Sequence, residues 1–459
     1  MNQLIAQKIR DFSLDLYEPL MPRDLSLGLP AKPRAGNLVT VVVGMRRCGK
    51  TYRLFQEIKA LLNQGVSPHQ ILYFNFEDDR FAPLTSSFGD EVIDTFYEMN
   101  PQLYQEGAYF FLDEIQEMDN WGAWLRRIVD TRKVTIYATG SSSKLLSADV
   151  ATEFRGRSLT YEMLPYSFSE YTRFHAPDLK SESSAYGSEE LARVKQLFSR
   201  YLQQGGFPGV QGESGERLLG ILQSYAQRAV AQDVIERHNL SNPQAVSLFA
   251  QRVLSLNGRE LSLRKMENDF RSQGTSVTRV ALGEALGYFE DAFLLACVRK
   301  FSRAFADNAR SASRVYAIDP GLAWANSLSS AQDIGQRLEG IVYLELRRRS
   351  NIARKGTIAT LRTQAHNYEV DFIVGDALSQ RGFDVYQVSV SVKDPKTRQR
   401  EMRALREAMA EKQLTQGYLL TMDDDEEDVA VSEGIIHVVP VWKWCLAKGG
   451  SDPYDAIFD

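Results

Sequence analysis

One short segment, Gly44–Thr51, constrains the fold of this chain more than any other. Its residues, Gly-Met-Arg-Arg-Cys-Gly-Lys-Thr, have the spacing G-x4-G-K-T, follow the β-branched run Leu38–Val43 and open a helix. In this context glycines let successive backbone N–H groups point at phosphate oxygens, and the helix N-terminus adds partial positive charge. The segment predicts a phosphate-binding loop, with Lys50 on the β- and γ-phosphates and the Thr51 hydroxyl on Mg²⁺. The residues expected to contact the nucleotide are Gly44, Arg47, Cys48, Gly49, Lys50, Thr51 and Tyr52.

A pair of acids ends another apolar run. Tyr109–Asp113 has the composition of a strand, and Glu114 follows it directly. Phosphoryl transfer depends mostly on positioning and electrostatics, and one group holds the metal while another orients the attacking water. We expect Asp113 to hold Mg²⁺ through water and Glu114 to orient and polarise the water that attacks ATP. The expected ligands are therefore ATP and Mg²⁺, and the expected reaction is ATP hydrolysis.

Two further segments are candidates for the same site. Thr139-Gly-Ser141 ends a strand expected beside the first one, so either hydroxyl would bind the γ-phosphate or the water; the alternative is a cap on the next helix. In Arg155-Gly-Arg157, one arginine would reach the γ-phosphate of a neighbouring subunit, which implies a homo-oligomer. The alternative for these arginines is an intramolecular salt bridge. Arg46 and Arg47, inside the loop, are expected at the surface or against the second strand rather than in catalysis.

The periodicity of apolar residues changes twice along the chain. Strands alternate with amphipathic helices from Leu38 to about residue 164, which predicts a three-layer α/β fold with a parallel sheet. A helical region follows, in which the turn Gly274–Ser276, the next helix and the predicted strand Ala292–Val298 indicate a winged helix-turn-helix. From about Gly335 a smaller α/β pattern begins. The expected domains are a lead-in (1–35), the P-loop domain (36–175), the helical and winged-helix region (176–330) and a C-terminal α/β domain (331–459).

Composition excludes several classes of protein. The three cysteines are far apart, which argues against a disulfide framework. No run approaches the ~20 apolar residues of a membrane helix, and we expect a cytoplasmic protein with no membrane partner. The net charge of −5 means that any contact with DNA would need a local basic patch. The acidic run Asp423–Asp428 is expected to be a solvated loop.

Several strings occur in one order along the chain: GMRRCGKT, YFNFEDDR, FFLDEIQEMDNW, TGSSSKLLS, FRGRS, GGFPGV, RVYAIDPGL, LEGIVYLELRRR and YEVDFIV. Together they resemble the bacterial and archaeal ATP-binding proteins that join an AAA-type head to a C-terminal domain of unassigned function. The resemblance extends from about residue 36 to 445. It implies an AAA-type P-loop ATPase, followed by a helical and winged-helix region and a restriction-endonuclease-like domain.

The C-terminal strings resemble the PD-(D/E)XK nuclease pattern in part. In that family an acid on a helix, an acid on a strand and E-x-K on the next strand bind metal and activate water. Glu339 and Asp371 match the first two elements, but Gln387-x-Ser389 stands at the third, and serine cannot replace the charge of lysine. Lys393 would do so only if the chain bends back. Three alternatives follow: an ATP-regulated nuclease, a degenerate fold that binds DNA or a protein, and a structural role for these acids.

The partner of the chain is expected to be DNA or a protein client. Basic residues that would contact DNA phosphates, or form a solvated face, are Arg299, Lys300, Arg303, Arg310, Arg314 and Arg347–Arg349. Two classes of function fit the motifs. One is an ATPase that couples hydrolysis to motion of its C-terminal domains, and the other is a nucleotide-gated scaffold with slow turnover.

Overall fold

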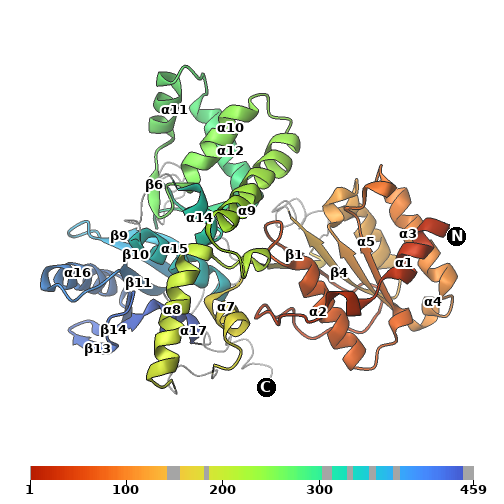
Figure 1. Cartoon of the computed structure of the whole chain (residues 1–459), viewed down its shortest axis with the longest axis horizontal. Coiled ribbons are helices and arrows are strands. Elements are labelled where there is room, and N and C mark those ends of the chain that lie inside the picture. The colour runs from red at the N-terminus through yellow and green to blue at the C-terminus, as the bar shows by residue number, and fades with distance from the viewer. Residues whose placement is uncertain are drawn as a thin grey trace. The chain divides into compact units, whose positions relative to one another are not determined.

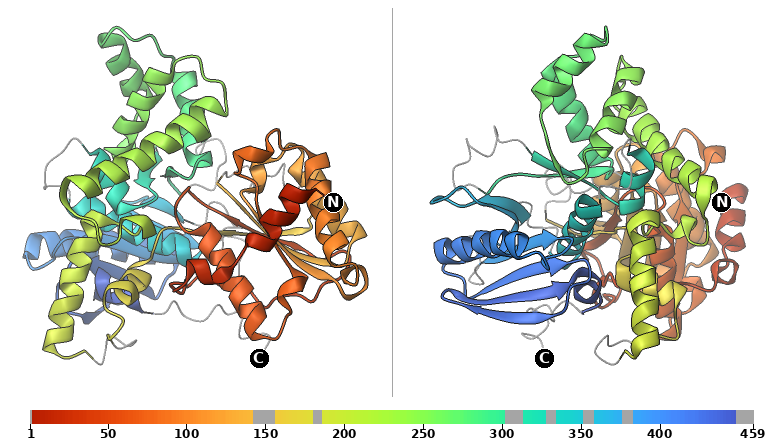
Figure 2. Two further views of the ribbon diagram at one scale, coloured as in Figure 1. Left: turned by 45° about the vertical axis from the view of Figure 1, so that its right-hand side comes forward. Right: turned by 60° about the vertical axis from the view of Figure 1, so that its left-hand side comes forward.

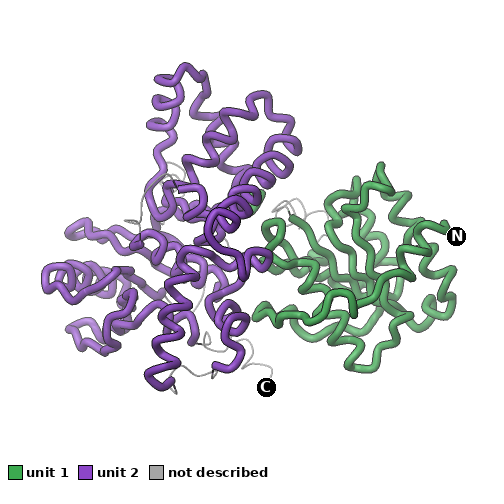
Figure 3. Tube along the Cα trace, viewed as in Figure 1, with its two compact units in different colours: residues 1–163, 291–293 green, residues 164–290, 294–459 purple. Residues whose placement is uncertain are grey.

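Figure 1 shows the computed structural model of the chain, which describes residues 2–141, 156–179, 186–301, 313–327, 334–350, 358–375 and 383–447. The chain forms two compact units (Figure 3). Unit 1 comprises residues 1–163 and 291–293, and unit 2 comprises residues 164–290 and 294–459. The expected lead-in and most of the P-loop domain fall in unit 1.

Unit 1 is built on a five-stranded sheet of order β2-β3-β4-β1-β5, in which every neighbouring pair is parallel. Its strands are β1 (Val39–Val43), β2 (Ile71–Asn75), β3 (Ala108–Asp113), β4 (Val134–Gly140) and β5 (Ser158–Glu162). Its helices are α1 (Gln3–Asp11), α2 (Lys50–Asn63), α3 (Ser86–Met99), α4 (Leu103–Glu106) and α5 (Trp121–Thr131), with short 3₁₀ helices at Leu14–Tyr17, Pro68–Gln70, Asp79–Phe81 and Ile115–Glu117. The α/β fold with a parallel sheet, predicted from the alternation of strands and helices, is confirmed.

Aromatic residues on β3 explain why this sheet has helices on both faces. Successive side chains of a strand point to opposite faces. Phe111 stacks on Tyr137, with ring centroids 4.9 Å apart, in the core that α2 covers. Phe110 points the other way and packs against Phe96 of α3, with ring centroids 5.8 Å apart. Because both faces are covered, all of β3 is buried, and polar groups gather at the strand ends.

The first part of unit 2 joins helices to a small antiparallel sheet. Its helices are α7 (Phe168–His175), α8 (Ser188–Gln204), a 3₁₀ helix (Pro208–Val210), α9 (Gly215–Arg228), a π-helix (Ala229–Glu236), α10 (Pro243–Leu254), α11 (Leu263–Ser272), α12 (Arg279–Asp291) and α14 (Pro320–Asn326). Its strands are β6 (Arg259–Leu261), β7 (Leu295–Val298) and β8 (Ser313–Ala317). They pair in the order β6-β8-β7.

The C-terminal part of unit 2 contains a six-stranded mixed sheet of order β13-β14-β12-β11-β10-β9. Its strands are β9 (Ile358–Arg362), β10 (Glu369–Gly375), β11 (Phe383–Ser389), β12 (Gln416–Thr421), β13 (Glu427–Val431) and β14 (Gly434–Pro440). Its helices are α15 (Ile334–Arg349), α16 (Pro395–Lys412) and α17 (Val441–Leu446). Figure 2 shows α16 along one face of the sheet, where Leu405 packs in the core with Val385. On the other face Phe372 stacks with Tyr343 of α15 at 6.3 Å.

Two predictions about single elements are wrong in part. The predicted strand Ala292–Val298 begins only at Leu295, because Phe293 has a left-handed φ of 53° that a strand does not contain. The acidic run Asp423–Asp428 is not wholly a loop, since Glu427 begins the edge strand β13, which pairs with β14. Acidic side chains are tolerated there because an edge strand faces water.

A buried carboxylate, Asp319, holds a glycine turn in unit 2. It caps α14 by accepting hydrogen bonds from the N–H groups of Gly321 at 2.8 Å and Leu322 at 3.2 Å, and it accepts a third from Gly206 at 2.7 Å. Burial raises the pKa of Asp319 to about 6, against these hydrogen bonds. The Gly206 carbonyl in turn accepts from the Tyr166 N–H at 2.7 Å. A Cβ on Gly206 would lie 2.2 Å from the Tyr166 carbonyl oxygen, so two backbones meet where only glycine fits.

We therefore expect Gly206→Ala to lower the free energy of unfolding by about 2–4 kcal/mol, because neither backbone can move away without losing hydrogen bonds. The matched control is Gly220→Ala in α9, where a Cβ meets no atom within 4 Å. Alanine in an exposed helix is expected to stabilise the protein there by about 0.5–1 kcal/mol. Urea denaturation followed by circular dichroism measures both. Equal midpoints for the two variants would contradict the close contact.

Candidate functional site

The predicted phosphate-binding loop lies between β1 and α2 of unit 1, and two glycines shape it. Gly44 leaves β1 with a φ of 154°, and a Cβ there would lie 2.2 Å from the Met163 carbonyl oxygen. Gly49 has a φ of 105° and begins α2 by accepting from the Arg53 N–H at 3.0 Å. A side chain at either position would be strained. The loop therefore delivers the N-terminal N–H groups of a 14-residue helix to one place.

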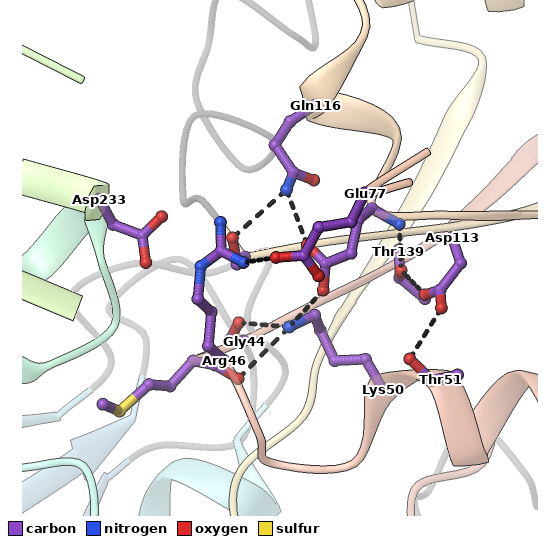
Figure 4. Close-up of polar contacts among 12 residues, drawn as sticks. Gly44, Arg46, Lys50, Thr51, Glu77, Asp113, Gln116, Thr139 and Asp233 are labelled. Atoms are coloured by element: carbon purple, nitrogen blue, oxygen red, sulfur yellow. Dashed lines mark hydrogen bonds and ion pairs between the residues drawn. The ribbon is translucent and has the colours of Figure 1, made fainter. Parts of the chain in front are cut away.

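Lys50 is charged but only 3% exposed. Its ammonium donates to the carbonyl oxygens of Gly44 at 3.2 Å and Met45 at 3.3 Å, and it lies 3.2 Å from a carboxylate oxygen of Glu114 (Figure 4). Burial acts to lower the pKa of Lys50, but Glu114 and other nearby groups keep that pKa above its usual value. The loop thus encloses a fixed positive charge.

Three elements donate hydrogen bonds to the carboxylate of Asp113, at the end of β3. Its Oδ2 accepts from the Thr51 hydroxyl of α2 at 2.8 Å and from the Tyr73 hydroxyl of β2 at 3.0 Å. Its Oδ1 accepts from the Thr139 hydroxyl of β4, and that hydroxyl accepts from the Glu114 N–H at 2.9 Å. Burial and the charge of Glu114 raise the pKa of Asp113, whereas the hydrogen bonds from Thr139 and Thr51 oppose the rise.

The residues at this strand end fit Mg²⁺, which prefers oxygen ligands in proteins. Thr51 Oγ1 and Asp113 Oδ2 offer a hydroxyl and a carboxylate 2.8 Å apart, directly beside the loop. Asp113 ends β3 and Thr51 lies in the first turn of α2, so a cation bound there would meet the phosphates of a nucleotide in the loop.

Glu114 follows β3 with a left-handed φ of 51°. One carboxylate oxygen faces Lys50, and the other accepts from Gln116 Nε2 at 2.7 Å. The same Gln116 nitrogen donates to Ser141 Oγ at 3.3 Å. Burial alone would raise the pKa of Glu114, but Lys50, Gln116 and Arg46 hold it below its usual value. These three neighbours therefore favour the ionised form of Glu114 at the loop.

Arg46 links the loop to the ends of two other elements. Its guanidinium donates to Glu77, after β2, at 2.6 Å and to Glu117 at 3.3 Å (Figure 4). The sequence predicts that Arg46 lies either at the surface or against the second strand. The contact with Glu77, which follows β2, agrees with the second alternative.

Three other expected nucleotide contacts lie on the loop or on α2. Arg47 is exposed with a φ of 69°, and Tyr52 is 47% exposed beside Tyr17, with ring centroids 6.2 Å apart. Cys48 is buried, and its carbonyl accepts from the guanidinium of Arg23 at 2.9 Å. Burial raises the pKa of the Cys48 thiol. Tyr52 is thus accessible, whereas the Cys48 side chain belongs to the core.

The sequence reasoning missed Tyr73, Gln116 and Arg23. Gln116 had a signal, because it stands two residues after Glu114 at the end of a strand. Tyr73 had none, since its contact with Asp113 depends on the pairing of β2 with β3. Arg23 lies in a proline-rich segment whose path no periodicity predicts.

Arg157 lies at the end of the sheet opposite to the loop. Its carbonyl accepts from the Val39 N–H at 2.9 Å, at the start of β1. The loop follows Val43, four strand residues or roughly 13 Å further along. The Arg157 guanidinium pairs with Asp130, and both side chains are about 40% exposed. Arg157 therefore forms the intramolecular salt bridge and does not reach the nucleotide loop of its own chain. Arg155 lies outside the described residues.

In unit 2, Glu339 of α15 and Asp371 of β10 lie close together, and Arg314 of β8 lies between them. Its guanidinium is 2.6 Å from Glu339 and 3.0 Å from Asp371, and it also contacts Glu369. The Tyr316 hydroxyl donates to Glu339 at 2.6 Å. Burial and repulsion from Asp371 raise the pKa of Glu339; burial raises that of Asp371, against Arg314. An internal arginine thus supplies the positive charge beside these acids.

The remaining parts of the nuclease pattern do not form a metal site here. Gln387 accepts from the Asp371 N–H at 3.3 Å and donates to a buried carboxylate of α16 at 2.8 Å. The Ser389 hydroxyl donates to a nearby backbone carbonyl. Lys393 is 75% exposed and lies 3.9 Å from Asp424, so it does not bend back. Within the described ranges, no group of three or more His, Cys, Asp or Glu side chains is arranged to hold a metal ion.

Among the basic residues predicted to contact DNA, most of those that the structure describes bind other groups of unit 2. Arg347 donates to the Tyr343 hydroxyl at 2.9 Å, Arg348 to the Pro165 carbonyl at 3.0 Å, and Arg349 to the Trp444 carbonyl at 2.7 Å. Together with Arg314, these guanidinium groups bind partners in their own unit. Contact of these residues with DNA stays a prediction. Arg303 and Arg310 lie outside the described residues.

In the part of the chain that the structure describes, no helix is long and apolar enough to span a bilayer.

Two family models match parts of the chain. Residues 36–172 match the model of an AAA domain, and residues 195–333 match a domain of unknown function. Among solved structures, the chain is similar to the Walker-type ATPase PABY2304 of Pyrococcus abyssi, with 14% identity over 71% of this chain and 95% of that chain at a TM-score of 0.40. It is also similar to the ORC2 protein of Aeropyrum pernix, with 13% identity over 68% and 89% at a TM-score of 0.34.

Two relatives have no assigned function. An uncharacterized protein of Haemophilus influenzae is 26% identical over 74% of this chain and 80% of its own length. The uncharacterized protein MJ1544 of Methanocaldococcus jannaschii is 31% identical over 97% of this chain and 93% of its own length. The chain therefore belongs to the same protein family as MJ1544, and its residues 36–172 form an AAA domain.

Proposed function

We propose that this chain is a Mg²⁺-dependent ATPase whose unit 2 binds a protein partner according to the nucleotide state of unit 1. The observation that carries the proposal is the convergence of Lys50, Thr51, Asp113 and Glu114 at one end of a parallel sheet. A buried lysine, a pair of oxygen ligands and an ionised carboxylate are the groups that hydrolysis of a nucleoside triphosphate requires.

Each of these residues has one role in the proposed reaction. The loop N–H groups and Lys50 bind the phosphate oxygens, and Thr51 and Asp113 would hold Mg²⁺. When bound, Mg²⁺ neutralises charge on the phosphates. Glu114 accepts the proton of the attacking water, while Thr139 fixes Asp113. Ser141 acts on the same site through Gln116.

We expect Lys50→Ala to abolish tight ATP binding, because it removes the buried charge that faces the phosphates. Glu114→Gln should keep ATP binding and lower kcat by about 10²- to 10⁴-fold, because an amide cannot accept the proton of water. Fluorescent-ATP titration and steady-state phosphate release measure the two effects. The matched control is Lys59→Ala on the same helix, since the Lys59 side chain is 44% exposed and pairs with Glu18 at the surface.

If Glu114→Gln hydrolysed ATP at the wild-type rate, Glu114 would not be the group that accepts the proton of the water. Tight ATP binding with very slow turnover in the wild-type protein would instead favour a nucleotide-gated scaffold.

We further propose that the active form is a homo-oligomer in which Arg155 or Arg157 contacts the γ-phosphate bound by a neighbouring copy. The position of Arg157 supports a role in trans, because its own loop lies at the other end of the sheet. Its salt bridge with Asp130 is solvent-exposed, and pairs of that kind contribute only about 0–1 kcal/mol, so it would open at low cost.

Arg155→Ala and Arg157→Ala should both bind ATP normally, and the one that removes the finger should lose turnover. Mixing that variant with Lys50→Ala should restore part of the activity, because a mixed oligomer pairs an intact loop with an intact arginine. Phosphate release across a range of mixing ratios measures the rescue. Failure of rescue at every ratio would eliminate a finger supplied in trans.

Two features of unit 2 support a binding module. The order α10-β6-α11-α12-β7-β8 supports a winged helix-turn-helix. The order α15-β9-β10-β11-α16-β12, with acids on α15 and β10, supports a degenerate nuclease-like domain. Ser389 and the guanidinium of Arg314 argue against metal-dependent cleavage. The internal use of Arg314 and Arg347–Arg349 favours a protein partner over DNA.

We therefore expect duplex or single-stranded DNA to leave ATP turnover unchanged and to remain uncut in Mg²⁺ or Mn²⁺. One reaction with labelled DNA measures phosphate release and cleavage together. Turnover that rises with DNA and falls again with added salt would make DNA the partner. Cleavage that disappears in Asp371→Ala would restore the nuclease alternative.

A further inference from the structure

We propose that Gln116 is a positioning residue for ATP hydrolysis, whose side-chain nitrogen holds Glu114 and whose side-chain oxygen holds the attacking water. The inference rests on the proposed ATPase function and adds a residue outside the G-x4-G-K-T loop and the Asp113–Glu114 pair.

The backbone places Gln116 beside Glu114. The left-handed conformation of Glu114 turns the chain sharply at the end of β3, and Ile115 is fully buried and anchors the short helix Ile115–Glu117. Gln116 Nε2 then lies 2.7 Å from Glu114 Oε2, 3.2 Å from Glu117 Oε1 and 3.3 Å from Ser141 Oγ. Figure 4 shows this amide on the same side of the loop as Lys50.

The chemistry of the contacts fixes which way the amide points. Ionised carboxylates only accept hydrogen bonds, so the nitrogen of Gln116 must face Glu114 and Glu117. Its oxygen Oε1 is consequently turned away from both. Oε1 is buried and has no hydrogen-bond donor among the described residues. A buried acceptor without a donor is unfavourable, and such atoms in native proteins call for a ligand or a water.

We expect a water molecule to donate the missing hydrogen bond to Gln116 Oε1. The phosphate oxygens of ATP bound to Mg²⁺ accept hydrogen bonds and have none to donate, so they do not satisfy an amide oxygen. A water held by both Gln116 Oε1 and Glu114 has its two protons engaged and a lone pair free. Glutamine orients water in this way in other nucleoside triphosphate hydrolases.

The step balances with the residues present. The water oxygen forms a bond to the γ-phosphorus as the bond between that phosphorus and the bridging oxygen breaks. The bridging oxygen leaves with ADP, and the proton of the water passes to Glu114. Gln116 keeps its proton count throughout, so it acts only by orienting the water and the carboxylate.

The test compares Gln116→Met with Gln105→Met in the full-length protein. Methionine keeps the length of the side chain but removes both polar atoms, and Gln105 is an exposed glutamine of the same unit. We expect Gln116→Met to lower kcat about 100-fold, which is the usual effect of losing one oriented polar contact to the reacting groups. The ATP dissociation constant and the thermal midpoint should stay at wild-type values, and single-turnover hydrolysis should fall as much as kcat. Gln105→Met should match the wild type.

A double variant distinguishes a residue that orients the water from one that only supports the structure of the site. If both residues act on one water, Gln116→Met should add almost nothing to the loss already present in Glu114→Gln. Multiplicative losses, an unchanged kcat in Gln116→Met, or a fall in kcat that accompanies weaker ATP binding and a lower thermal midpoint would each overturn the inference. If the wild type does not hydrolyse ATP, the proposed function falls and takes this inference with it. If the wild type hydrolyses ATP, Glu114→Gln does not, and Gln116→Met does, this inference alone falls.

Discussion

The contact on which the candidate site depends is the hydrogen bond between Thr51 and Asp113. It joins the first turn of α2 to the end of β3, two elements that are far apart in the sequence. Thr139 and Tyr73 bind the same carboxylate from the strands on either side of β3. A parallel sheet brings all its strand ends to one edge, so a single buried carboxylate can fix the relative positions of three strands and the loop. This contact holds the first turn of α2 against the strand end that carries Asp113.

The same constraint explains which parts of the site could be predicted from the sequence. Lys50, Thr51, Asp113 and Glu114 lie in short strings whose spacing alone implies their chemistry, and the structure brings them together. The alternation of apolar strands and helices predicted the parallel sheet of unit 1, because its central strands β1, β3 and β4 are buried on both faces. Tyr73 reaches Asp113 only through the pairing of β2 with β3, and no short motif in the sequence indicates such a contact.

Unit 2 was less predictable because its polar residues interact over long distances in the sequence. Glu339 and Asp371 were predicted to lie together, and they do, but their partner Arg314 comes from β8 of another sheet. Nothing in the run of basic residues around Arg314 separates a surface cation from a buried one. The arginines that end α15 illustrate the same difficulty, since a helix C-terminus favours them for its dipole as well as for contacts. The residue type predicts that these arginines are charged, but only the fold shows which groups they contact.

Lys50 and Arg314 each contact carboxylates, but they differ in a way that matches their proposed roles. Lys50 is a compact point charge that contacts two carbonyls and one carboxylate at 3.2–3.3 Å. Phosphate oxygens can take over contacts of that kind, because an ammonium imposes little geometry on its partners. Arg314 contacts three carboxylates through a rigid planar fork, and its pKa is raised far above its usual value by Glu339 and Asp371, although burial opposes the rise. A guanidinium held in that way keeps its charge at every pH at which the protein is folded. The lysine therefore suits a site that exchanges ligands, whereas the arginine suits a permanent connection between β8 and the C-terminal sheet.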